Sequence, residues 1–468
     1  MSGFGRIVST VSVESPLLAS EETAASIRSG ADRAEIRIDA FADPVNASSL
    51  TGLAGKLPLV FSGNRVSLAP GEEIILREAS SRGAWIDIPF EEGRPLPAWV
   101  DRNRTVLSCH RRLESFSELR SLFSSMKESA RIVKIVCPVR DIGEAAGFTE
   151  WTRELDSAGS LIAFPSGIES GPARLIALAS GSAAVYAASP GSPPAAEGQM
   201  KLGELMRFDP VGITGDTSFY GLLGHPLEFS LSPGLWNSWF RRLGMNSRFL
   251  LFPSSSPEAA LKAFSMWSVP GFGVTAPFKE KIIGMLDSLC NTAERCGAVN
   301  TVKSDGGKLL GANTDVHGIR MSLSGMGKGL RVLVLGSGGA ARAALAALKN
   351  SHRAFLSARS PEKGRKTADE FGAVFVEWES KHEGVYDMVI NSTSCGADGK
   401  EMPWERDRRL GAKVLFEMVT RGEKTPLERK AEKEGLTVIA GATMLAHQAR
   451  HQFRILTGVK PPKESIRH

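Results

Sequence analysis

The chain has 468 residues, and at about 150 residues per domain this length predicts three compact units. Hydrophobic residues make up 42% and charged residues 23%, as is typical of a soluble globular protein, and no apolar run is long enough to span a bilayer. The net charge is +6, with basic residues scattered among acids. We therefore expect small anionic substrates, and neither a nucleic-acid nor a membrane partner.

Cysteine usage favours a cytoplasmic protein. The five cysteines are odd in number and lack Cys-x-x-Cys spacing, which predicts a reduced compartment without structural zinc. A strand-like run begins at Arg6, which leaves no room for a signal or transit peptide. We expect a cytoplasmic chain without a metal site.

Short runs rich in β-forming residues recur between Gly5 and Ala188, with helix-length connections between them. They are Arg6–Val13, Ala34–Ile38, Leu57–Phe61, Ala84–Ile88, Thr105–Cys109, Ile132–Cys137, Leu161–Phe164 and Ala183–Ala187. The repetition predicts an α/β fold of the (β/α)8 barrel type, with its active site at the carboxyl ends of the strands. The clearest helices are Ser115–Glu128 and Glu144–Ser157, and Lys201–Arg207 is expected to close the barrel.

Charged residues inside these strands are candidate functional groups. In the second run Glu35, Arg37 and Asp39 alternate with Ile36 and Ile38, so the charged residues share one face and the isoleucines the other. Because the outer face of a barrel packs on helices, we expect the charges in the lumen, where they persist only if paired or used. A salt-bridge network that closes the barrel is the alternative to a functional role.

Lys134 lies in the middle of an otherwise apolar run. Desolvation and nearby cations lower the pKa of a lysine, and a neutral amine is a nucleophile toward ketones. Lys134 is therefore a candidate Schiff-base residue, with a lysine that snorkels from the barrel end as the alternative. His110 ends a neighbouring run and could move protons at the adduct, although a strand-end histidine is often only a packed polar residue.

The first half, about Arg6–Phe208, resembles type I 3-dehydroquinate dehydratase. The resemblance is carried by AEIRID at 34–39, SCH at 108–110, VKI at 133–135, Arg174, and GQ at 198–199. It implies that Lys134 forms an imine with the substrate ketone. It also implies that His110 moves protons during imine formation, α-proton removal and loss of water.

The same resemblance implies a substrate-binding set and shows two departures from the family. The residues implied to hold the carboxylate and hydroxyls are Glu35, Arg37, Arg65, Arg174 and Gln199. Ala69 stands where the family has a glutamate that orients the histidine, and Glu72 or Glu73 are possible substitutes. Ala195 stands where the family has a serine. Both losses are expected to slow the barrel rather than to abolish its chemistry.

Residues 209–218 are the predicted linker, and polar side chains beyond it follow several β-like runs. They are Ser230, Ser232, Thr275, Lys279, Asn300 and Asp315. Such groups could line one cleft. Serines in loops commonly serve only as helix caps, and Ser232 before Pro233 fits that role.

Arg331–Leu348 predicts a strand, a glycine turn and a helix of the kind that binds a dinucleotide. The run Val332–Leu335 is wholly apolar, as expected of a parallel strand buried on both faces. Glycines let the following backbone approach a ligand, and the next helix directs its N-terminus at the turn, which suits a pyrophosphate. The candidate cofactor residues are Gly336, Ser337, Gly338, Gly339 and Ala340. A glycine turn that serves packing alone is the alternative.

The second strand of this region, Ala354–Ser357, bears on cofactor choice. Arg359 follows where an NAD site usually has an acid on the ribose hydroxyl. Lys363, Arg365 and Lys366 lie behind it, so we predict NADP(H). An ordinary basic helix face is the alternative.

The second half, about Phe219–Gly458, resembles shikimate dehydrogenase. The motifs, in family order, are SLSP, GVTAPFK, GAVNT, NTD, GSGGAA, INSTSCG and GATMLAHQA. The resemblance implies that shikimate is bound by Ser230, Ser232, Thr275, Asn300 and Gln448. Lys279 and Asp315 would form the catalytic pair, because a ketone oxygen needs a proton and charge stabilisation as hydride arrives. A structural ion pair is the alternative.

The resemblance also implies the domain plan. A barrel at 1–208 precedes a substrate domain at 219–316, completed by 441–468, and a Rossmann-type cofactor domain at 317–440. Gly273 and Ala358 each stand where the family usually has asparagine.

Together the two resemblances predict a bifunctional shikimate-pathway enzyme, in which the product of the first site, 3-dehydroshikimate, is the substrate of the second. One alternative is a catalytically silent barrel that acts as a scaffold. Another is a quinate/shikimate dehydrogenase of broader specificity. We expect a monomer or a small homo-oligomer.

Overall fold

A computed structural model of the chain describes residues 4–41, 48–53, 57–63, 70–155, 157–227 and 230–462. The chain divides into two compact units. The first comprises Met1–Phe219, Asn246–Arg248 and Ala259–Ser268, and the second Tyr220–Met245, Phe249–Glu258 and Val269–His468. In the described part, no helix is long and apolar enough to cross a membrane.

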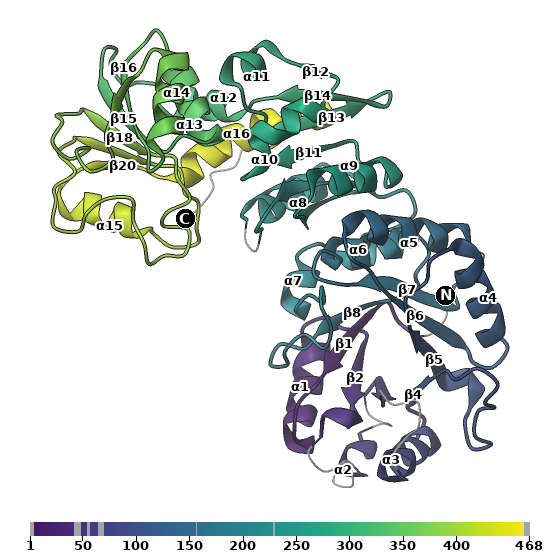
Figure 1. The fold of residues 1–468 in the computed structure, drawn as a ribbon. Helices are drawn as coiled ribbons and strands as arrows, with labels where there is room; N and C mark the ends of the chain where they lie inside the picture. Colours follow the sequence, from purple (N-terminus) through teal and green to yellow (C-terminus); the bar gives the residue numbers. More distant parts are fainter. Residues whose placement is uncertain are drawn as a thin grey trace. The chain divides into compact units, whose positions relative to one another are not determined.

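Eight strands of the first unit form a nearly closed parallel sheet (Figure 1). Neighbours are hydrogen bonded in the order β7-β6-β5-β4-β3-β2-β1-β8. Beyond that order, the Ala183 N–H donates to the Leu161 carbonyl at 2.8 Å, just before β8. The sheet is consistent with the predicted (β/α)8 barrel. The strands are β1 (Ile7–Val11), β2 (Arg33–Arg37), β3 (Leu59–Ser62), β4 (Trp85–Pro89), β5 (Thr105–His110), β6 (Ile132–Pro138), β7 (Leu161–Ser166) and β8 (Val185–Ala188).

Helices connect most of these strands. The predicted helix at 115–128 is confirmed as α4, whose N-cap Ser115 accepts from the Glu118 N–H at 3.3 Å. The helix predicted at 144–157 begins earlier, because Asp141 caps it by accepting from the Glu144 N–H at 2.9 Å. The helices are α1 (Pro16–Arg28), α2 (Ser48–Thr51), α3 (Pro70–Ser81), α4 (Phe116–Met126), α5 (Ile142–Glu154), α6 (Gly171–Ala179) and α7 (Leu202–Met206).

The connection from β4 to β5 differs from the prediction. Residues 90–104, all of them described, contain only a 3-10 turn at Arg102–Arg104 and no α-helix. Pro95 and Pro97 lie in this connection, and proline disfavours a helix at its own position and just before it.

The isoleucines of the second strand region pack as predicted, and Glu35, on the other face of β2, is also buried. Ile36 and Ile38 are fully buried in an outer core with Leu76 of α3. The strict alternation ends earlier than predicted, because Asp39 lies in a 3-10 turn, Ile38–Ala40, after the strand.

The strands that follow the linker form a mixed sheet in the order β10-β9-β11-β13-β14-β12. β9 and β11 pair in parallel, whereas β13 is antiparallel to both β11 and β14. The strands are β9 (Ser218–Gly224), β10 (Ser247–Pro253), β11 (Gly271–Val274), β12 (Ser288–Leu289), β13 (Thr301–Asp305) and β14 (Lys308–Ala312). The helices between and after them are α8 (Ser232–Arg242), α9 (Pro257–Met266), α10 (Phe278–Lys281), α11 (Asn291–Cys296) and α12 (Asp315–Ser322).

The last sheet is parallel throughout, in the order β17-β16-β15-β18-β19-β20. Numbered from its own first strand this order is 3-2-1-4-5-6, the Rossmann order, and such sheets bind dinucleotides where the order reverses. The strands are β15 (Arg331–Leu335), β16 (Arg353–Ser357), β17 (Val374–Val376), β18 (Met388–Asn391), β19 (Val414–Glu417) and β20 (Thr437–Ile439). The helices are α13 (Gly339–Leu348), α14 (Pro361–Phe371) and α15 (Pro426–Lys433).

The final helix, α16 (Gly441–Thr457), returns to the mixed sheet. It packs along α12 and against β11 and β13, and is the long yellow helix in Figure 1. This return brings residues near the end of the chain beside β11, the start of β13 and the loop that follows β14.

Candidate active site

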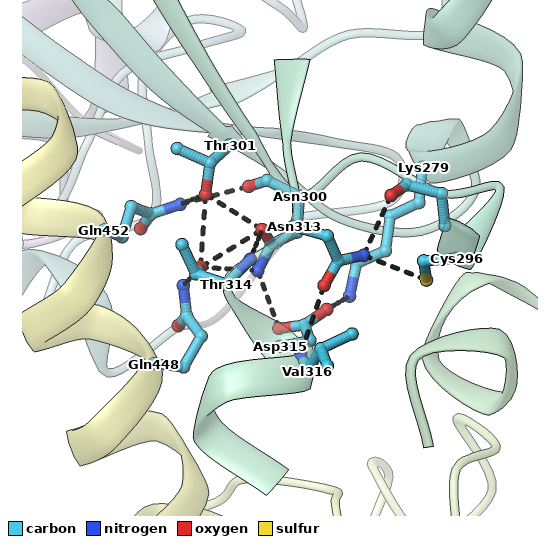
Figure 2. Close-up of polar contacts among 11 residues, drawn as sticks. Lys279, Cys296, Asn300, Thr301, Asn313, Thr314, Asp315, Val316, Gln448 and Gln452 are labelled. Carbon is cyan, nitrogen blue, oxygen red and sulfur yellow. Dashed lines mark hydrogen bonds and ion pairs between the residues drawn. The ribbon is translucent and has the colours of Figure 1, made fainter. Parts of the chain in front are cut away.

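Lys279 and Asp315 form a close ion pair (Figure 2). Lys279 lies in the short helix α10 after β11, and Asp315 is the first residue of α12 after β14. The distance from Lys279 Nζ to Asp315 Oδ2 is 2.6 Å, and Asn300 Nδ2 donates to the other carboxylate oxygen at 2.7 Å. Since Asn300 holds one carboxylate oxygen of Asp315, the carboxylate has a fixed orientation. Its other oxygen therefore holds the Lys279 ammonium in place.

Amides and hydroxyls extend this pair into a buried network (Figure 2). Asn300 Oδ1 accepts from the Thr314 N–H at 2.7 Å, and Gln448 Nε2 of α16 donates to Thr314 Oγ1 at 2.8 Å. Gln452, one turn further along α16, donates to the Asn300 carbonyl at 3.0 Å and to Thr301 Oγ1 at 2.9 Å. The structure thus brings Lys279, Asn300, Asp315 and Gln448 together.

Ser230 and Thr275 follow the neighbouring strands β9 and β11, and Ser232 begins the helix α8. The Thr275 N–H donates to the Leu223 carbonyl at 2.8 Å, which ties the end of β11 to β9. Ser232 does not cap α8 as the alternative reading proposed, because it is the first residue of the helix and Leu231 is the N-cap. The Ser232 N–H instead donates to Ser230 Oγ at 3.1 Å.

The glycine turn after β15 lies beside the ion pair. Gly336 has a φ of +110°, and an added Cβ there would lie 3.1 Å from Ser392 Oγ. At Gly339 an added Cβ would lie 2.7 Å from Lys279 Cβ. At Gly338, the N-cap of α13, it would meet no protein atom within 4 Å. Ser337 lies within this turn and Ala340 in the first turn of α13. The backbone is therefore open at Gly338 and pressed against Lys279 at Gly339.

Arg359 follows β16 and is exposed. Lys363 pairs with Glu280 at 3.1 Å, and Arg365 pairs with Glu377. Two of the three basic residues predicted behind Arg359 thus have carboxylate partners. Arg359 and Lys366 are both exposed, and an exposed guanidinium offers paired donors that suit a phosphate.

Lys134 lies in the lumen of the barrel, 6% exposed. Its ammonium donates to Asp87 Oδ2 and, at 3.4 Å, to Glu35 Oε1, and it lies 4.8 Å from the ring centroid of Tyr186. Burial lowers the pKa of Lys134, but Asp87 and Glu35 outweigh it, so the pKa is raised. The expected neutral amine is therefore wrong for the unliganded chain, because carboxylates and not cations surround it.

Glu35 and Asp87 respond differently to the shared ammonium. Burial raises the pKa of Glu35, but Lys134 and Arg37 outweigh it and the pKa falls below its usual value. At Asp87 burial dominates and raises the pKa. In the lumen Glu35 thus stays ionised, whereas Asp87 accepts a proton more readily.

The other predicted barrel residues surround this group. Thr10 Oγ1 donates to Glu35 Oε2 at 2.9 Å, and Gln199 Nε2 donates to Thr10 Oγ1 at 3.1 Å. Arg174 is 3% exposed, and burial lowers its pKa to about 10. Arg37 is engaged by Asp39, at 2.9 Å from Nε and 2.7 Å from Nη2. Buried polar atoms without a hydrogen-bond partner among the described residues include Ser62 Oγ, Arg174 Nε and Tyr186 Oη.

His110 ends β5, and the pairing of β5 with β6 sets Ser108 opposite Lys134 and His110 opposite Val136. Its side chain is exposed to solvent. The protein around the ring still desolvates it in part, and this desolvation, followed by repulsion from Lys134, lowers the pKa of His110. The imidazole is neutral at pH 7 and can accept a proton.

Some barrel predictions concern residues after β3. Arg65 and Ala69 lie outside the described residues. Of the two carboxylates considered as substitutes, Glu72 is 2% exposed, whereas Glu73 is exposed and accepts from Trp99 Nε1 at 3.1 Å. Glu72 is therefore the carboxylate that α3 buries.

Comparison with known proteins identifies the second half. Residues 222–302 match the family described as shikimate dehydrogenase substrate binding domain, and residues 441–468 match the shikimate 5'-dehydrogenase C-terminal domain. The shikimate dehydrogenase (NADP(+)) of Maridesulfovibrio salexigens is 33% identical over 256 residues, which are 53% of this chain and 94% of that protein. The chain belongs to the shikimate dehydrogenase family.

Other family members give similar values. The shikimate dehydrogenase (NADP(+)) of Methanothermobacter thermautotrophicus is 36% identical over 271 residues, 53% of this chain and 94% of that protein. A crystal structure of shikimate dehydrogenase from Aquifex aeolicus is 35% identical, covers 53% of this chain and 94% of its own, and has a TM-score of 0.48. These matches bear on the dehydrogenase half, whereas the dehydratase resemblance rests on the residues of the barrel.

Two contact residues were missed by the sequence analysis. Asp87 stands in Trp85-Ile86-Asp87-Ile88, the same alternation that singled out Glu35, and this pattern could have found it. Gln452 follows Gln448 by one helical turn, which predicts a shared face. Its partners on β13 depend on tertiary packing, and no local pattern indicates them.

Proposed function

We propose that residues 219–468 reduce 3-dehydroshikimate to shikimate with NADPH. The observation that carries this proposal is the close approach of the glycine turn to Lys279 of the ion pair. Any side chain at Gly339 would collide with Lys279, because an added Cβ would lie 2.7 Å from Lys279 Cβ. A dinucleotide held at this turn would lie next to Lys279 and Asp315. The relatives named shikimate dehydrogenase (NADP(+)) support the same reaction.

In this proposal the residues of the chain bind the ketone and manage its proton. NADPH, when bound, supplies the hydride to the carbonyl carbon. Lys279 Nζ donates a proton to the carbonyl oxygen as charge develops there, the Asp315 carboxylate stabilises the ammonium before the transfer, and the amine regains its proton from solvent water. Asn300 and Gln448 orient the substrate hydroxyls.

The open backbone at Gly338 and the N-terminus of α13 fit a pyrophosphate. Arg359 fits a 2′-phosphate because its guanidinium is exposed and offers paired donors. No acid stands at this position to favour NAD. The exposed Arg359 and the lack of an acid at this position support NADP over NAD.

The test is shikimate oxidation with NADP+ and NAD+ as alternative acceptors, and with quinate as an alternative substrate. We expect kcat/KM with NADP+ to exceed that with NAD+, and Arg359→Ala to lose about tenfold with NADP+ alone, as for one charge-assisted contact. Preference for NAD+, or no turnover of shikimate, would overturn the proposal. NAD+-linked turnover of quinate would support the broader dehydrogenase instead.

We further propose that the barrel dehydrates 3-dehydroquinate to 3-dehydroshikimate through an imine at Lys134. The buried ammonium next to Asp87 favours this function, because a carboxylate with a raised pKa can take the proton that the amine must lose. The buried unpartnered atoms Ser62 Oγ and Arg174 Nε are suited to a polar, anionic ligand.

The proposed steps conserve atoms. The Lys134 nitrogen bonds to the ketone carbon, and the ketone oxygen leaves as water. His110 removes the α-proton, and the β-hydroxyl then departs as a second water with the aid of that proton. Hydrolysis of the imine consumes one water and releases the enone, so the net change is the loss of one water.

Borohydride reduction tests the imine directly. We expect reduction in the presence of 3-dehydroquinate to leave a covalent adduct on Lys134, visible by peptide mass, and Lys134→Ala to abolish both adduct and enone. The absence of an adduct, together with full activity of Lys134→Ala, rules out the imine. No enone from the wild-type chain would favour the silent scaffold.

A further inference from the structure

A side chain at position 273 would make a tight contact with Gln452 of α16. Gly273 is the third residue of β11, opposite Thr301 in antiparallel β13 and beside Leu222 in parallel β9. An added Cβ would lie 3.0 Å from Leu222 Cδ1 and 3.1 Å from Gln452 Nε2. The amide of Gln452 therefore occupies the space over this position.

Gln452 uses that space to hold the start of β13 (Figure 2). Its side chain is 5% exposed, and Nε2 donates to the Asn300 carbonyl and to Thr301 Oγ1 at 3.0 and 2.9 Å. The Val274 N–H donates to the same carbonyl at 2.8 Å. Two donors thus fix the backbone of Asn300, one from β11 and one from α16.

Fixing Asn300 matters because its side chain reaches the ion pair. Thr301 Oγ1 donates to Asn300 Oδ1 at 2.8 Å, and Asn300 Nδ2 donates to Asp315 Oδ1. Gln452 therefore acts on both ends of Asn300, through its carbonyl and through the hydroxyl that orients its amide. The ammonium of Lys279 lies one contact further on.

We propose that Gln452 is a positioning residue for the substrate site, and that glycine at 273 leaves the space that the Gln452 amide occupies. This inference rests on the proposed dehydrogenase function. Residues directly opposite in an antiparallel pair place their side chains on the same face. An asparagine at 273, the usual residue of the family, would therefore direct its own amide toward Thr301 and could serve in place of Gln452.

The test is a reciprocal exchange in the full-length chain. Four proteins are compared: the wild type, Gln452→Ala, Gly273→Asn, and the double variant. Arg454→Ala, on the exposed face of α16, is the matched control for truncating a long side chain on this helix. Each protein is measured for kcat and KM with shikimate and with NADP+, and for Tm.

The expected pattern is mutual rescue. Gln452→Ala should lower kcat/KM for shikimate about tenfold, as for one or two lost hydrogen bonds, and leave KM for NADP+ within about twofold. Gly273→Asn alone should lower it by a similar factor through overpacking. The double variant should return to within about threefold of the wild type, as coupled neighbours do, and Arg454→Ala should stay at wild-type values.

Two results would overturn the inference. One is a double variant whose loss equals the product of the two single losses. The other is wild-type shikimate kinetics in Gln452→Ala. If the wild type itself did not oxidise shikimate, the proposed function would fall, and the coupling of positions 273 and 452 would still be decided by the four Tm values.

Discussion

At the scale of single residues, Lys134 shows how much a local sequence pattern can predict. The sequence singled out Lys134 because an ammonium is costly in an apolar strand, and the structure does bury it. It did not indicate that Asp87 and Glu35, from two other strands, would raise the pKa of the amine. Partners supplied by distant strands depend on the barrel register, which no local alternation contains.

The sequence pattern also did not indicate a buried carboxylate in the cofactor sheet. Glu417 is fully buried at the end of β19 and accepts from Asn391 Nδ2 at 2.8 Å and from Thr425 Oγ1 at 3.0 Å. Burial raises its pKa to about 7, against these hydrogen bonds. Asn391 Oδ1 in turn accepts from Thr393 Oγ1 at 2.7 Å, and Thr393 lies next to the glycine turn that is proposed to bind the cofactor.

This raised pKa gives a stability prediction. A carboxyl that titrates near pH 7 when folded and near 4.5 when unfolded binds more protons in the folded state between these values, so its contribution is full at low pH and is lost as pH rises. Against Glu417→Gln, which does not titrate, the wild type should lose stability from pH 5 to pH 8, by an amount on the order of 1–3 kcal/mol. Parallel curves of Tm against pH for the two proteins would contradict this.

At the scale of elements, the sequence located the strands better than their connections. The apolar runs at Val332–Leu335 and Leu161–Phe164 correspond to β15 and β7 within a few residues, because a buried parallel strand needs an unbroken apolar run. The two-residue strand β12 has no such run and was not foreseen. The connection from β4 to β5 was expected to be helical, and its prolines favour an extended loop.

Gly339 shows what an element requires of one residue. The first turn of α13 reaches Lys279 because no side chain separates them, and Gly339→Ala would push the helix and the lysine apart. We expect kcat/KM with shikimate and NADP+ to fall roughly tenfold to a hundredfold, as for small displacements of reacting groups. Gly284→Ala, where an added Cβ meets no atom within 4 Å, is the control. Equal kinetics for the two variants would show that the approach of α13 does not matter.

At the scale of the whole molecule, the two lysines belong to different compact units. The proposed product of the barrel is the proposed substrate of the dehydrogenase, so one chain would carry two consecutive steps. Because each lysine has its own carboxylate partners within its own unit, removal of one should leave the other site intact.

The most direct test is a coupled assay with 3-dehydroquinate and NADPH on the wild type, Lys134→Ala and Lys279→Ala, with the exposed Lys281→Ala as the control lysine. Enone absorbance reports the first step and NADPH consumption the second. The wild type should consume NADPH, and Lys134→Ala should do so only when given 3-dehydroshikimate. Lys279→Ala should accumulate enone and lose about 10²–10⁴-fold in reduction, as when a proton donor is removed. Enone formation by Lys134→Ala at the wild-type rate, or NADPH consumption by Lys279→Ala at the wild-type rate, would contradict the account of two separate lysine sites.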